Sequence, residues 1–334
     1  MGLLSAIYSL IISGRRFIYS TGLKETRMLP KKVISVGNLT LGGTGKTPAV
    51  ISLAREAKKR GFKPCILTRG YKGKAKGPVF VTSGKEPVLS VYDAGDEPVL
   101  MARKLEDIPI VMGKCRYCAG LFALDNCAHE SIDLFILDDG FQHWGVHRDI
   151  DMIFIDATNP FGNGKLFPEG ILREPVIALG RAHVIVMTKT DAVSQEQLSA
   201  ITGELKQSNA GAPIYLSAYS PVSLVNVSGE IKDIESLRNT EIYAFAGIAN
   251  PSYFKTMLVS RGLKVVKFKE FRDHYIYKQN DIDIVAKEAS GLTIITTEKD
   301  MVKLSNLKLP GNVFALGIEF SIDEEFYNYI FGRL

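Results

Sequence analysis

The hydrophobic positions of the chain follow two periods, and their alternation predicts a sheet covered by helices. Short aliphatic and β-branched runs are typical of buried strands, and they occur at 33–36, 64–67, 108–112, 134–137, 150–155 and 184–187. A stretch with helical spacing, 49–60, follows the first run and ends at Gly61. Apolar strands that alternate with helices indicate an α/β fold with a doubly wound, mostly parallel sheet.

A second series of strands predicts a second, smaller α/β domain. Its apolar runs lie at 242–246, 265–268, 293–296 and 313–316, again with helical stretches between them. The segment 217–229 separates the two series and is rich in Ser, Pro and Gly. We therefore expect three parts: an N-terminal helix in 1–30, a larger domain in 31–218 and a smaller domain in 219–334.

The first thirty residues predict an amphipathic helix. An apolar stretch at 3–12 is followed at once by Arg15 and Arg16. A secretory signal carries its positive charge before the apolar stretch, so this order excludes one. The helix could lie in a membrane interface among anionic headgroups, or it could pack on its own domain with its arginines in solvent. The pattern leaves both interpretations open.

The loop after the first strand carries a phosphate-binding pattern. It reads VGNLTLGGTGKT at 36–47, between a predicted strand and a predicted helix. In such a loop, backbone N–H groups at a helix N-terminus bind phosphate oxygens, a lysine reaches the outer phosphates and a hydroxyl ligates Mg²⁺. The strict pattern has Gly where Thr40 stands. The predicted nucleotide-binding residues are Thr40, Leu41, Gly42, Gly43, Thr44, Gly45, Lys46 and Thr47.

Carboxylates provide the next signal. Asp138 and Asp139 end an apolar strand, at the edge where open α/β sheets bind ligands. We assign the orientation of Mg²⁺ first to Asp138, with Asp139 beside it. A second acidic pair, Asp96 and Glu97, and a lone histidine, His274, are weak signals by spacing alone.

A competing class of function comes from the strand end at 188–191, Thr-Lys-Thr-Asp. This pattern is similar to the guanine-reading loop of P-loop GTPases. It keeps open a GTPase or a metallochaperone-like switch, which would prefer GTP to ATP. A P-loop binding or scaffold protein without catalysis is a further alternative.

The composition of the chain mainly excludes some classes of protein. The chain is 46% apolar and 23% charged, which is ordinary for a globular protein, and no apolar run approaches the roughly 20 residues of a spanning helix. Six of the 41 Lys and Arg residues and one of the 36 acidic residues lie in 1–32, so the remaining 35 of each sign balance. The positive charge is therefore N-terminal, and we expect no nucleic-acid partner and no obligate protein partner. The four cysteines are too few and unevenly placed for a disulfide framework, and we expect reduced thiols.

Several separated stretches together resemble the tetraacyldisaccharide 4′-kinase family, the lipid A pathway kinases of Gram-negative bacteria. The similar stretches occur in family order over most of the chain: 35–48, TRGY at 68–71, GDEPVL at 95–100, DDGFQH at 138–143, 149–156, 161–175, 244–254, 273–274 and TEKD at 297–300. No single stretch is decisive; the ordered set is specific.

The resemblance implies a function and a set of residues. It implies ATP and Mg²⁺, and transfer of the γ-phosphate to the 4′-hydroxyl of a tetraacyldisaccharide 1-phosphate, which forms lipid IV-A at the cytoplasmic face of the inner membrane. It implies a catalytic pair, Asp96 and His274, with Glu97 beside Thr47 at the metal. It also implies substrate or phosphate contacts from Arg69, Tyr71, Gln142, Arg173 and Glu174. The smaller domain would then close over the active site, and the N-terminal helix would dock on the membrane as a peripheral or monotopic anchor.

Overall fold

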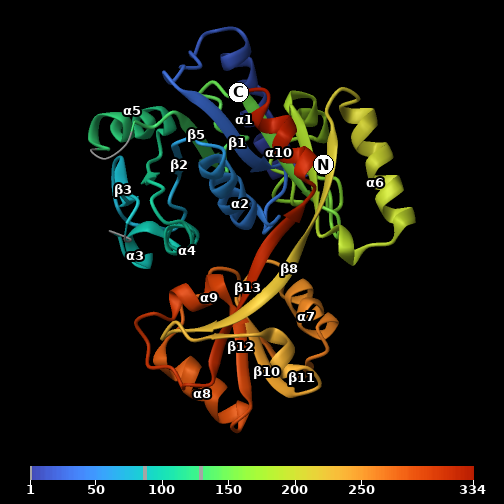
Figure 1. The fold of residues 1–334 in the computed structure, drawn as a ribbon. Helices are drawn as coiled ribbons and strands as arrows, with labels where there is room; N and C mark the ends of the chain where they lie inside the picture. The colour runs from blue at the N-terminus through green and yellow to red at the C-terminus, as the bar shows by residue number, and fades with distance from the viewer. Residues whose placement is uncertain (1, 86–88, 128–130) are drawn as a thin grey trace. The chain divides into compact units, whose positions relative to one another are not determined.

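The chain forms two compact units in the computed structural model, which describes residues 2–85, 89–127 and 131–334. The first unit comprises Met1–Ala218 and Phe320–Leu334, and the second comprises Tyr219–Glu319. Two long strands, β8 (Ile214–Asn226) and β13 (Val313–Ile322), carry the chain from one unit to the other and back (Figure 1). The sequence assigns all of 219–334 to the smaller domain, whereas the structure places the last segment, 320–334, with the first unit.

The first unit contains strands and helices in alternation. Its strands are β1 (Lys32–Asn38), β2 (Pro64–Thr68), β3 (Val79–Thr82), β4 (Ile110–Met112), β5 (Leu134–Asp138), β6 (Ile150–Asp156), β7 (Val184–Thr188) and the first part of β8. Its helices are α1 (Leu3–Ser20), α2 (Lys46–Lys59), α3 (Val91–Ala94), α4 (Asp96–Lys104), α5 (Arg116–Asn126), α6 (Gln195–Ser208) and α10 (Glu324–Phe331), with short 3₁₀ turns η1 (Val176–Arg181) and η2 (Thr190–Ala192).

The sheet of the first unit has the strand order β3-β4-β2-β5-β1-β6-β7-β8. All neighbours pair in parallel except β3, which is antiparallel to β4. The central strands are buried along their whole length, as parallel strands with helices on both faces must be. The predicted doubly wound, mostly parallel sheet is confirmed.

Helices cover both faces of this sheet. Side chains of α5 pack on one face around Val33, Phe135 and Leu137, and α6 and η1 extend the same layer over Ile153 and Ile185. Helix α2 buries its apolar stripe, residues 49–57, on the opposite face, where α4 and α10 lie against it. The amino end of α2 therefore reaches the carboxyl edge of the sheet, which positions the site described below.

The second unit has its own parallel sheet. The strand order is β11 (Lys264–Glu270), β10 (Glu241–Ala246), β12 (Thr293–Thr297) and β13, followed by β8, with the short β9 (Ile231–Lys232) antiparallel to β8. Helices α7 (Pro251–Ser260), α8 (Gln279–Ala289) and α9 (Glu298–Lys303) and the 3₁₀ turn η3 (Ile234–Leu237) complete it. Its core gathers Tyr243, Phe245, Ile294 and Ala315 with the inward face of α8.

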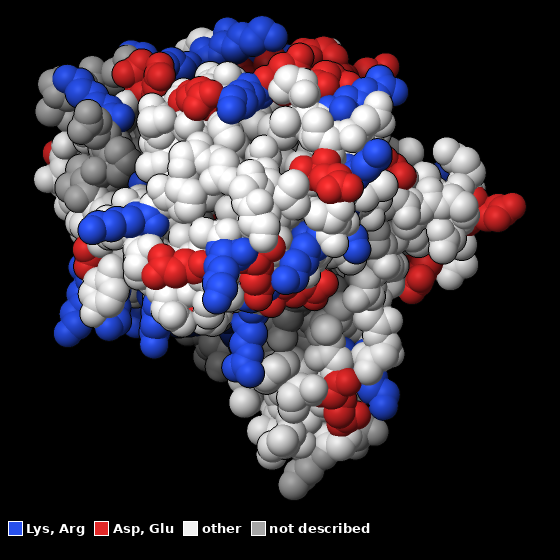
Figure 2. Space-filling view, turned by 90° about the horizontal axis from the view of Figure 1, so that it is seen from below, with Lys and Arg blue, Asp and Glu red and all other residues white. Residues whose placement is uncertain are grey.

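Charges of both signs share the visible surface. On the face that Figure 2 presents, Lys and Arg side chains are interleaved with Asp and Glu side chains. This agrees with the balance of 35 bases and 35 acids beyond residue 32. Interleaved charges largely cancel at a distance, so this face carries little net field.

The expectation of reduced thiols is wrong for one pair of cysteines. Cys115 and Cys118 are joined as a disulfide, while Cys65 and Cys127 are free. The pair stands at the start of α5, where one helical turn brings the two Cα atoms to 5.3 Å. That separation is within the usual range for a disulfide.

Candidate functional site

The predicted phosphate-binding loop joins β1 to α2. Gly45 caps the helix in the left-handed conformation, with φ 77°, and Lys46 is the first helical residue. Gly42 also has a positive φ, 107°. These two positions require glycine because a Cβ is disfavoured there, and they turn the chain into the helix N-terminus, where the dipole favours phosphate.

Thr40 stands where the strict pattern has glycine, and its surroundings explain why. It forms an antiparallel bridge with Leu172, and the neighbouring backbone groups pair from Leu41 N to Ile171 O at 2.7 Å. The amide of Asn38 donates to the Thr40 carbonyl at 2.8 Å. The start of the loop is therefore held as a short ribbon, a conformation open to any residue.

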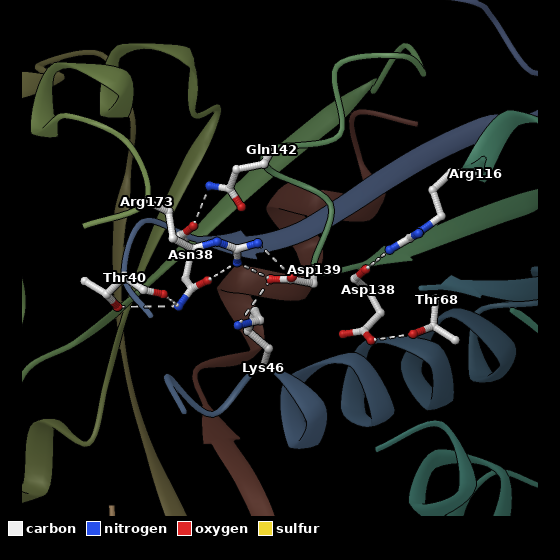
Figure 3. Close-up of polar contacts among 9 residues, drawn as sticks. All are labelled: Asn38, Thr40, Lys46, Thr68, Arg116, Asp138, Asp139, Gln142 and Arg173. Carbon is white, nitrogen blue, oxygen red and sulfur yellow. Dashed lines mark hydrogen bonds and ion pairs between the residues drawn. The ribbon is translucent and has the colours of Figure 1, made fainter. Parts of the chain in front are cut away.

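Lys46, Asp139 and Arg173 form the ionic centre of the site (Figure 3). The Lys46 ammonium lies 3.4 Å from Asp139 Oδ1. Arg173 donates to both oxygens of the same carboxylate, at 2.8 and 3.1 Å, and reaches Asn38 Oδ1 at 3.3 Å. Burial opposes the ionisation of Asp139, but the two cations outweigh it and hold its pKa well below the ordinary value. Asp139 is thus an anion that fixes two cations, Lys46 and Arg173, beside the loop.

Asp138 points to the other side of the same strand end. Thr68 Oγ1 donates to its carboxylate at 2.9 Å, and Arg116 Nη2 donates to its backbone carbonyl at 3.3 Å. Burial, and then the negative charges of Glu97 and Asp139, raise the pKa of Asp138 from 3.8 to about 6, although Lys46 and Thr68 act in the opposite direction. The carboxylate is therefore costly to ionise without a further cation.

These oxygen groups suit Mg²⁺. The mutual repulsion of Asp138 and Glu97, visible in the raised pKa of Asp138, is the kind that a divalent cation relieves. Thr47 lies in the first turn of α2, where a P-loop hydroxyl ligates the ion. Among the described residues there is no group of three or more His, Cys, Asp or Glu side chains that could hold a metal. A small number of protein oxygens is what Mg²⁺ uses when substrate phosphates and waters complete its shell.

Asp96 and Glu97 open helix α4. Asp96 is buried and accepts a hydrogen bond from the Glu97 backbone N–H at 3.0 Å. Gly95 precedes it with φ 92°, and a Cβ at Gly95 would clash with the carbonyl oxygen of Tyr71. The loop that carries Arg69 and Tyr71 is thus packed against the start of α4.

The predicted substrate residues differ in their surroundings. Arg69 and Tyr71 are exposed after the carboxyl end of β2. The Gln142 amide donates to the Asn38 carbonyl at 2.9 Å. Glu174 is buried, and both of its oxygens accept from Arg181, at 2.8 and 3.1 Å.

His143 indicates an electropositive region beside this cluster. Burial, together with the positive charges of Arg116, Arg15, Arg148 and Arg69, lowers the pKa of His143 to about 4. A neutral imidazole surrounded by guanidinium groups marks a place where an anionic group would be stabilised.

Two residues of the Thr-Lys-Thr-Asp pattern at 188–191 bind the backbone of the phosphate loop. Thr188 Oγ1 donates to the Thr44 carbonyl at 3.1 Å, and Lys189 Nζ donates to the Gly43 carbonyl at 3.2 Å. Lys189 also pairs with Asp156. Both side chains are directed at the backbone of the loop.

His274 belongs to the second unit. It has a left-handed backbone with φ 56°, and its ring Nε2 lies 3.4 Å from Lys299 Nζ and 3.7 Å from the Asp273 carboxylate. Asp96, in contrast, belongs to the first unit.

Helix α1 is amphipathic, as the sequence predicts. Its inner side binds the first unit: Ser5 Oγ donates to Leu166 O and Tyr8 Oη donates to Arg173 O, each at 3.2 Å. Its outer side exposes a run of apolar side chains, namely Leu4, Ile7, Leu10, Ile11, Phe17 and Ile18. In the part of the chain that the structure describes, no helix is long and apolar enough to cross a membrane.

Sequence reasoning missed four residues that hold the site together. Asn38 contacts Arg173, and Arg181 contacts Glu174. Thr68 and Arg116 both contact Asp138. Asn38 and Thr68 could have been suspected, because each is a polar residue that ends an apolar strand. Nothing in the spacing marks Arg116 or Arg181.

The parallel sheet, the glycine-rich loop at the amino end of α2 and the acids at the carboxyl edge define a P-loop α/β protein. A family model described as tetraacyldisaccharide-1-P 4′-kinase (LpxK) matches residues 1–334. The chain belongs to the tetraacyldisaccharide 4′-kinase family.

Individual relatives agree. Tetraacyldisaccharide 4′-kinase of Geobacter sulfurreducens is 39% identical over 303 residues, covering 90% of this chain and 82% of that protein. The protein of the same name from Halothermothrix orenii is 36% identical, covering 96% and 88%. A crystal structure described as the "apo" form of LpxK from Aquifex aeolicus in complex with ATP superposes with a TM-score of 0.78 at 33% identity, covering 99% of this chain and 97% of that one. The resemblance drawn from the sequence is confirmed, and the GTPase alternative has no support among these relatives.

Proposed function

We propose that this enzyme transfers the γ-phosphate of ATP to the 4′-hydroxyl of a tetraacyldisaccharide 1-phosphate, with Mg²⁺ as cofactor, and so forms lipid IV-A in lipid A biosynthesis. The observation that carries the proposal is the cluster of Lys46, Asp139 and Arg173 at the P-loop. It presents two cations, fixed by one carboxylate, where the outer phosphates of a nucleotide would lie. The names of the relatives support the acceptor, and the Aquifex structure supports ATP.

Phosphoryl transfer needs positioning and charge neutralisation more than covalent help. Backbone N–H groups of 42–47 would bind the β- and γ-phosphates, with Lys46 on the migrating group. Arg173 would neutralise charge from the acceptor side. Because Asp139 fixes both cations before substrate binds, little reorganisation would be required during transfer.

Thr47, Asp138 and Glu97 would hold Mg²⁺. When bound, the ion would neutralise charge on the β- and γ-phosphate oxygens. Thr68 fixes one oxygen of Asp138, which orients the carboxylate.

The acceptor hydroxyl is barely ionised at neutral pH, so a base within hydrogen-bond reach would assist its attack. We propose Asp96 as that base and His274 as the residue that orients it or carries the proton onward, with the smaller domain closing over the site. Asp96 starts a helix next to the loop that carries Arg69 and Tyr71. These two side chains, with Gln142, are proposed to contact the acceptor, and Glu174 would act through Arg181.

The electropositive region around His143 would suit the phosphate of the acceptor. Arg15, one of the cations that lower the His143 pKa, is a residue of α1. Helix α1 thus links an exposed apolar surface to the acceptor side of the site. We propose that it docks at the cytoplasmic face of the inner membrane as a peripheral or monotopic anchor.

The test uses purified enzyme, detergent-dispersed tetraacyldisaccharide 1-phosphate, Mg²⁺ and either ATP or GTP, with lipid phosphorylation as readout. We expect transfer from ATP, strongly reduced in Asp96→Asn, which keeps the size of the side chain but not its basicity. Glu106→Gln, an acid on a surface turn, is the control and should match wild type. Lipid-independent hydrolysis of GTP without transfer would contradict the proposal.

A further inference from the structure

A buried carboxylate in the second unit has no role in the transfer as proposed. Asp300, in α9, is fully buried and belongs to the TEKD stretch. Its oxygens accept hydrogen bonds from Thr297 Oγ1 at 2.7 Å and Tyr277 Oη at 2.9 Å. The Lys303 ammonium pairs with it at 2.6 Å. A buried charge pair is costly to build, and this one is held by several hydrogen bonds.

The network leads to Gly247, just after β10. The Gly247 N–H donates to Asp300 Oδ2 at 2.9 Å, and the Gly247 carbonyl accepts from Lys303 Nζ at 3.3 Å. A Cβ at this position would lie 2.7 Å from Tyr277 Oη and 3.1 Å from Asp300 Oδ1. Only glycine fits between the members of the network. We call Gly247, Tyr277, Asp300 and Lys303 the Asp300 clamp.

The Gly247 carbonyl has a second partner, the backbone N–H of His274, at 3.3 Å. His274 is in the left-handed region with φ 56°, a conformation that costs free energy for a residue with a Cβ. Such a conformation persists only where the surroundings impose it. Here the imposed contact runs from the buried charge pair through one residue, Gly247, to the backbone of His274.

We propose that Asp300 and Lys303 are positioning residues that hold His274, through Gly247, in the conformation needed for transfer. The proposal rests on the role given to His274 above. It gives a role to two stretches of the sequence to which the transfer proposed above assigns none, 244–254 and 297–300: one supplies the glycine and the other the carboxylate.

The experiment measures kcat and KM for ATP and lipid in the full-length enzyme. Four variants are compared with wild type: Asp300→Asn, His274→Ala, the double variant of these two, and Glu288→Gln. Glu288 is the matched control, because it also binds a tyrosine and two lysines (Tyr243, Lys267 and Lys269), none of which belongs to the Asp300 clamp.

We expect His274→Ala to lower kcat by about 10²-fold or more. Asp300→Asn should lower kcat at least about tenfold with both KM values unchanged, because displacement of a reacting group affects the transition state more than binding. In the double variant, kcat should equal that of His274→Ala. Glu288→Gln should match wild type.

Any other outcome overturns either the clamp or the role of His274. If Asp300→Asn slows the His274→Ala enzyme by the same factor as it slows wild type, or if Glu288→Gln is equally slow, the clamp does not act through His274. A slow His274→Ala enzyme with a normal Asp300→Asn enzyme overturns the clamp alone. A normal His274→Ala enzyme overturns the role of His274 and the clamp with it.

Asp300→Asn leaves Lys303 buried without its counter-ion, so that variant could fail to fold. Tyr277→Phe then takes its place, since it removes one hydrogen bond to Asp300 and little volume. A severalfold fall in kcat, absent in the His274→Ala background, supports the clamp. An unchanged kcat overturns it.

Discussion

At the scale of single residues, some of the non-glycine positions with left-handed backbones belong to the contacts described above. Among the described residues they include Asp139, Lys189 and His274, with φ between 52° and 57°. Asp139 binds Lys46 and Arg173, Lys189 binds the phosphate loop, and His274 is held by Gly247. Strain of this kind persists where other contacts impose it, and here those contacts are ion pairs for Asp139 and Lys189 and a backbone hydrogen bond for His274.

The role of Lys46 can be tested against another lysine of the same helix. Lys46→Met should lower kcat by about 10²–10³-fold, because it removes a preorganised cation from the migrating phosphoryl group. Lys58, also in α2, is half exposed and pairs with surface groups of 106–107. Lys58→Met should therefore keep wild-type turnover. Steady-state lipid phosphorylation measures both, and equal effects would contradict the assignment.

Asp138 should show a cost in stability that depends on pH. Burial raises its pKa to about 6, above the ordinary 3.8, so the folded protein binds the extra proton between these values and loses stability as pH rises through the window. Asp138→Asn removes the charge and should raise Tm by a few degrees at pH 7.5 without Mg²⁺. At pH 5 the wild-type carboxyl is mostly protonated, so the gain should shrink.

Thermal unfolding at both pH values measures this effect. Asp133→Asn, a partly exposed acid just before the same strand, is the control for a general change in charge. An equal gain at pH 5 and pH 7.5 would show that ionisation of Asp138 is not the cause. Loss of lipid phosphorylation in the stabilised variant would fit a carboxylate retained for Mg²⁺ at the expense of stability.

At the scale of elements, the central strands that are buried on both faces could be predicted from sequence, whereas β3 and β8 could not. The central strands are continuous aliphatic runs because both faces are covered. In β8 the buried positions include Ser217, Tyr219 and Pro221. Because Ser and Pro are typical of linkers, the sequence predicts a linker where the structure has a strand. The edge strand β3 is short and only partly buried.

In the candidate site, too, one part could be predicted from sequence and another could not. The phosphate loop could be predicted because its chemistry depends on local spacing, with glycines at fixed positions before Lys46. The partners of its carboxylates could not, because Arg116 and Arg173 reach Asp138 and Asp139 from separate elements. Such contacts arise from tertiary packing and leave no period in the sequence.

Helix α1 contacts the candidate site on one side and exposes apolar side chains on the other. Tyr8, on its inner side, donates to the carbonyl of Arg173, whose guanidinium binds Asp139. The outer side exposes Leu10 and Ile11, at 72% and 63%. An apolar surface of this kind, on a helix that is fixed by its other side, would bring the acceptor side of the enzyme to the lipid.

Ile11→Glu should therefore lower partitioning to anionic vesicles at least about tenfold, since burial of one such side chain contributes roughly 1.5–3 kcal/mol. Val259→Glu is the control, because Val259 is also half exposed on a helix but belongs to α7 of the second unit. Vesicle sedimentation measures both variants. Equal losses would place the contact elsewhere or make it nonspecific.

At the scale of the whole molecule, the chain leaves the first unit, builds the second and returns. Helix α10 then packs on the unit in which the chain began, and Figure 1 shows its red ribbon among the elements of that unit. Tyr327 Oη lies 2.6 Å from Ser52 Oγ of α2, and Arg60 Nη2 lies 2.6 Å from Glu324. The end of the chain thus stabilises the helix whose other end carries Lys46.

This arrangement predicts that damage to the last helix is felt in the first unit. Phe326 is buried against Tyr215, with ring centroids 5.4 Å apart. Phe326→Ala should cost about 3–5 kcal/mol of unfolding free energy, as other large-to-small core changes do. Amide hydrogen exchange should rise in α2, against which α10 packs, and in β8, which carries Tyr215, because the loosened helix no longer protects them.

The second unit provides the comparison. Phe314, buried in β13, lies in Tyr219–Glu319, so Phe314→Ala should raise exchange in β12 and β10 and leave α2 protected. If Phe326→Ala instead loosened β12 and spared α2, residues 320–334 would belong energetically to the second unit. The two variants together show whether residues 320–334 stabilise the second unit, which they follow in the sequence, or the first unit, on which they pack. The buried aromatic contacts of α10 favour the first unit.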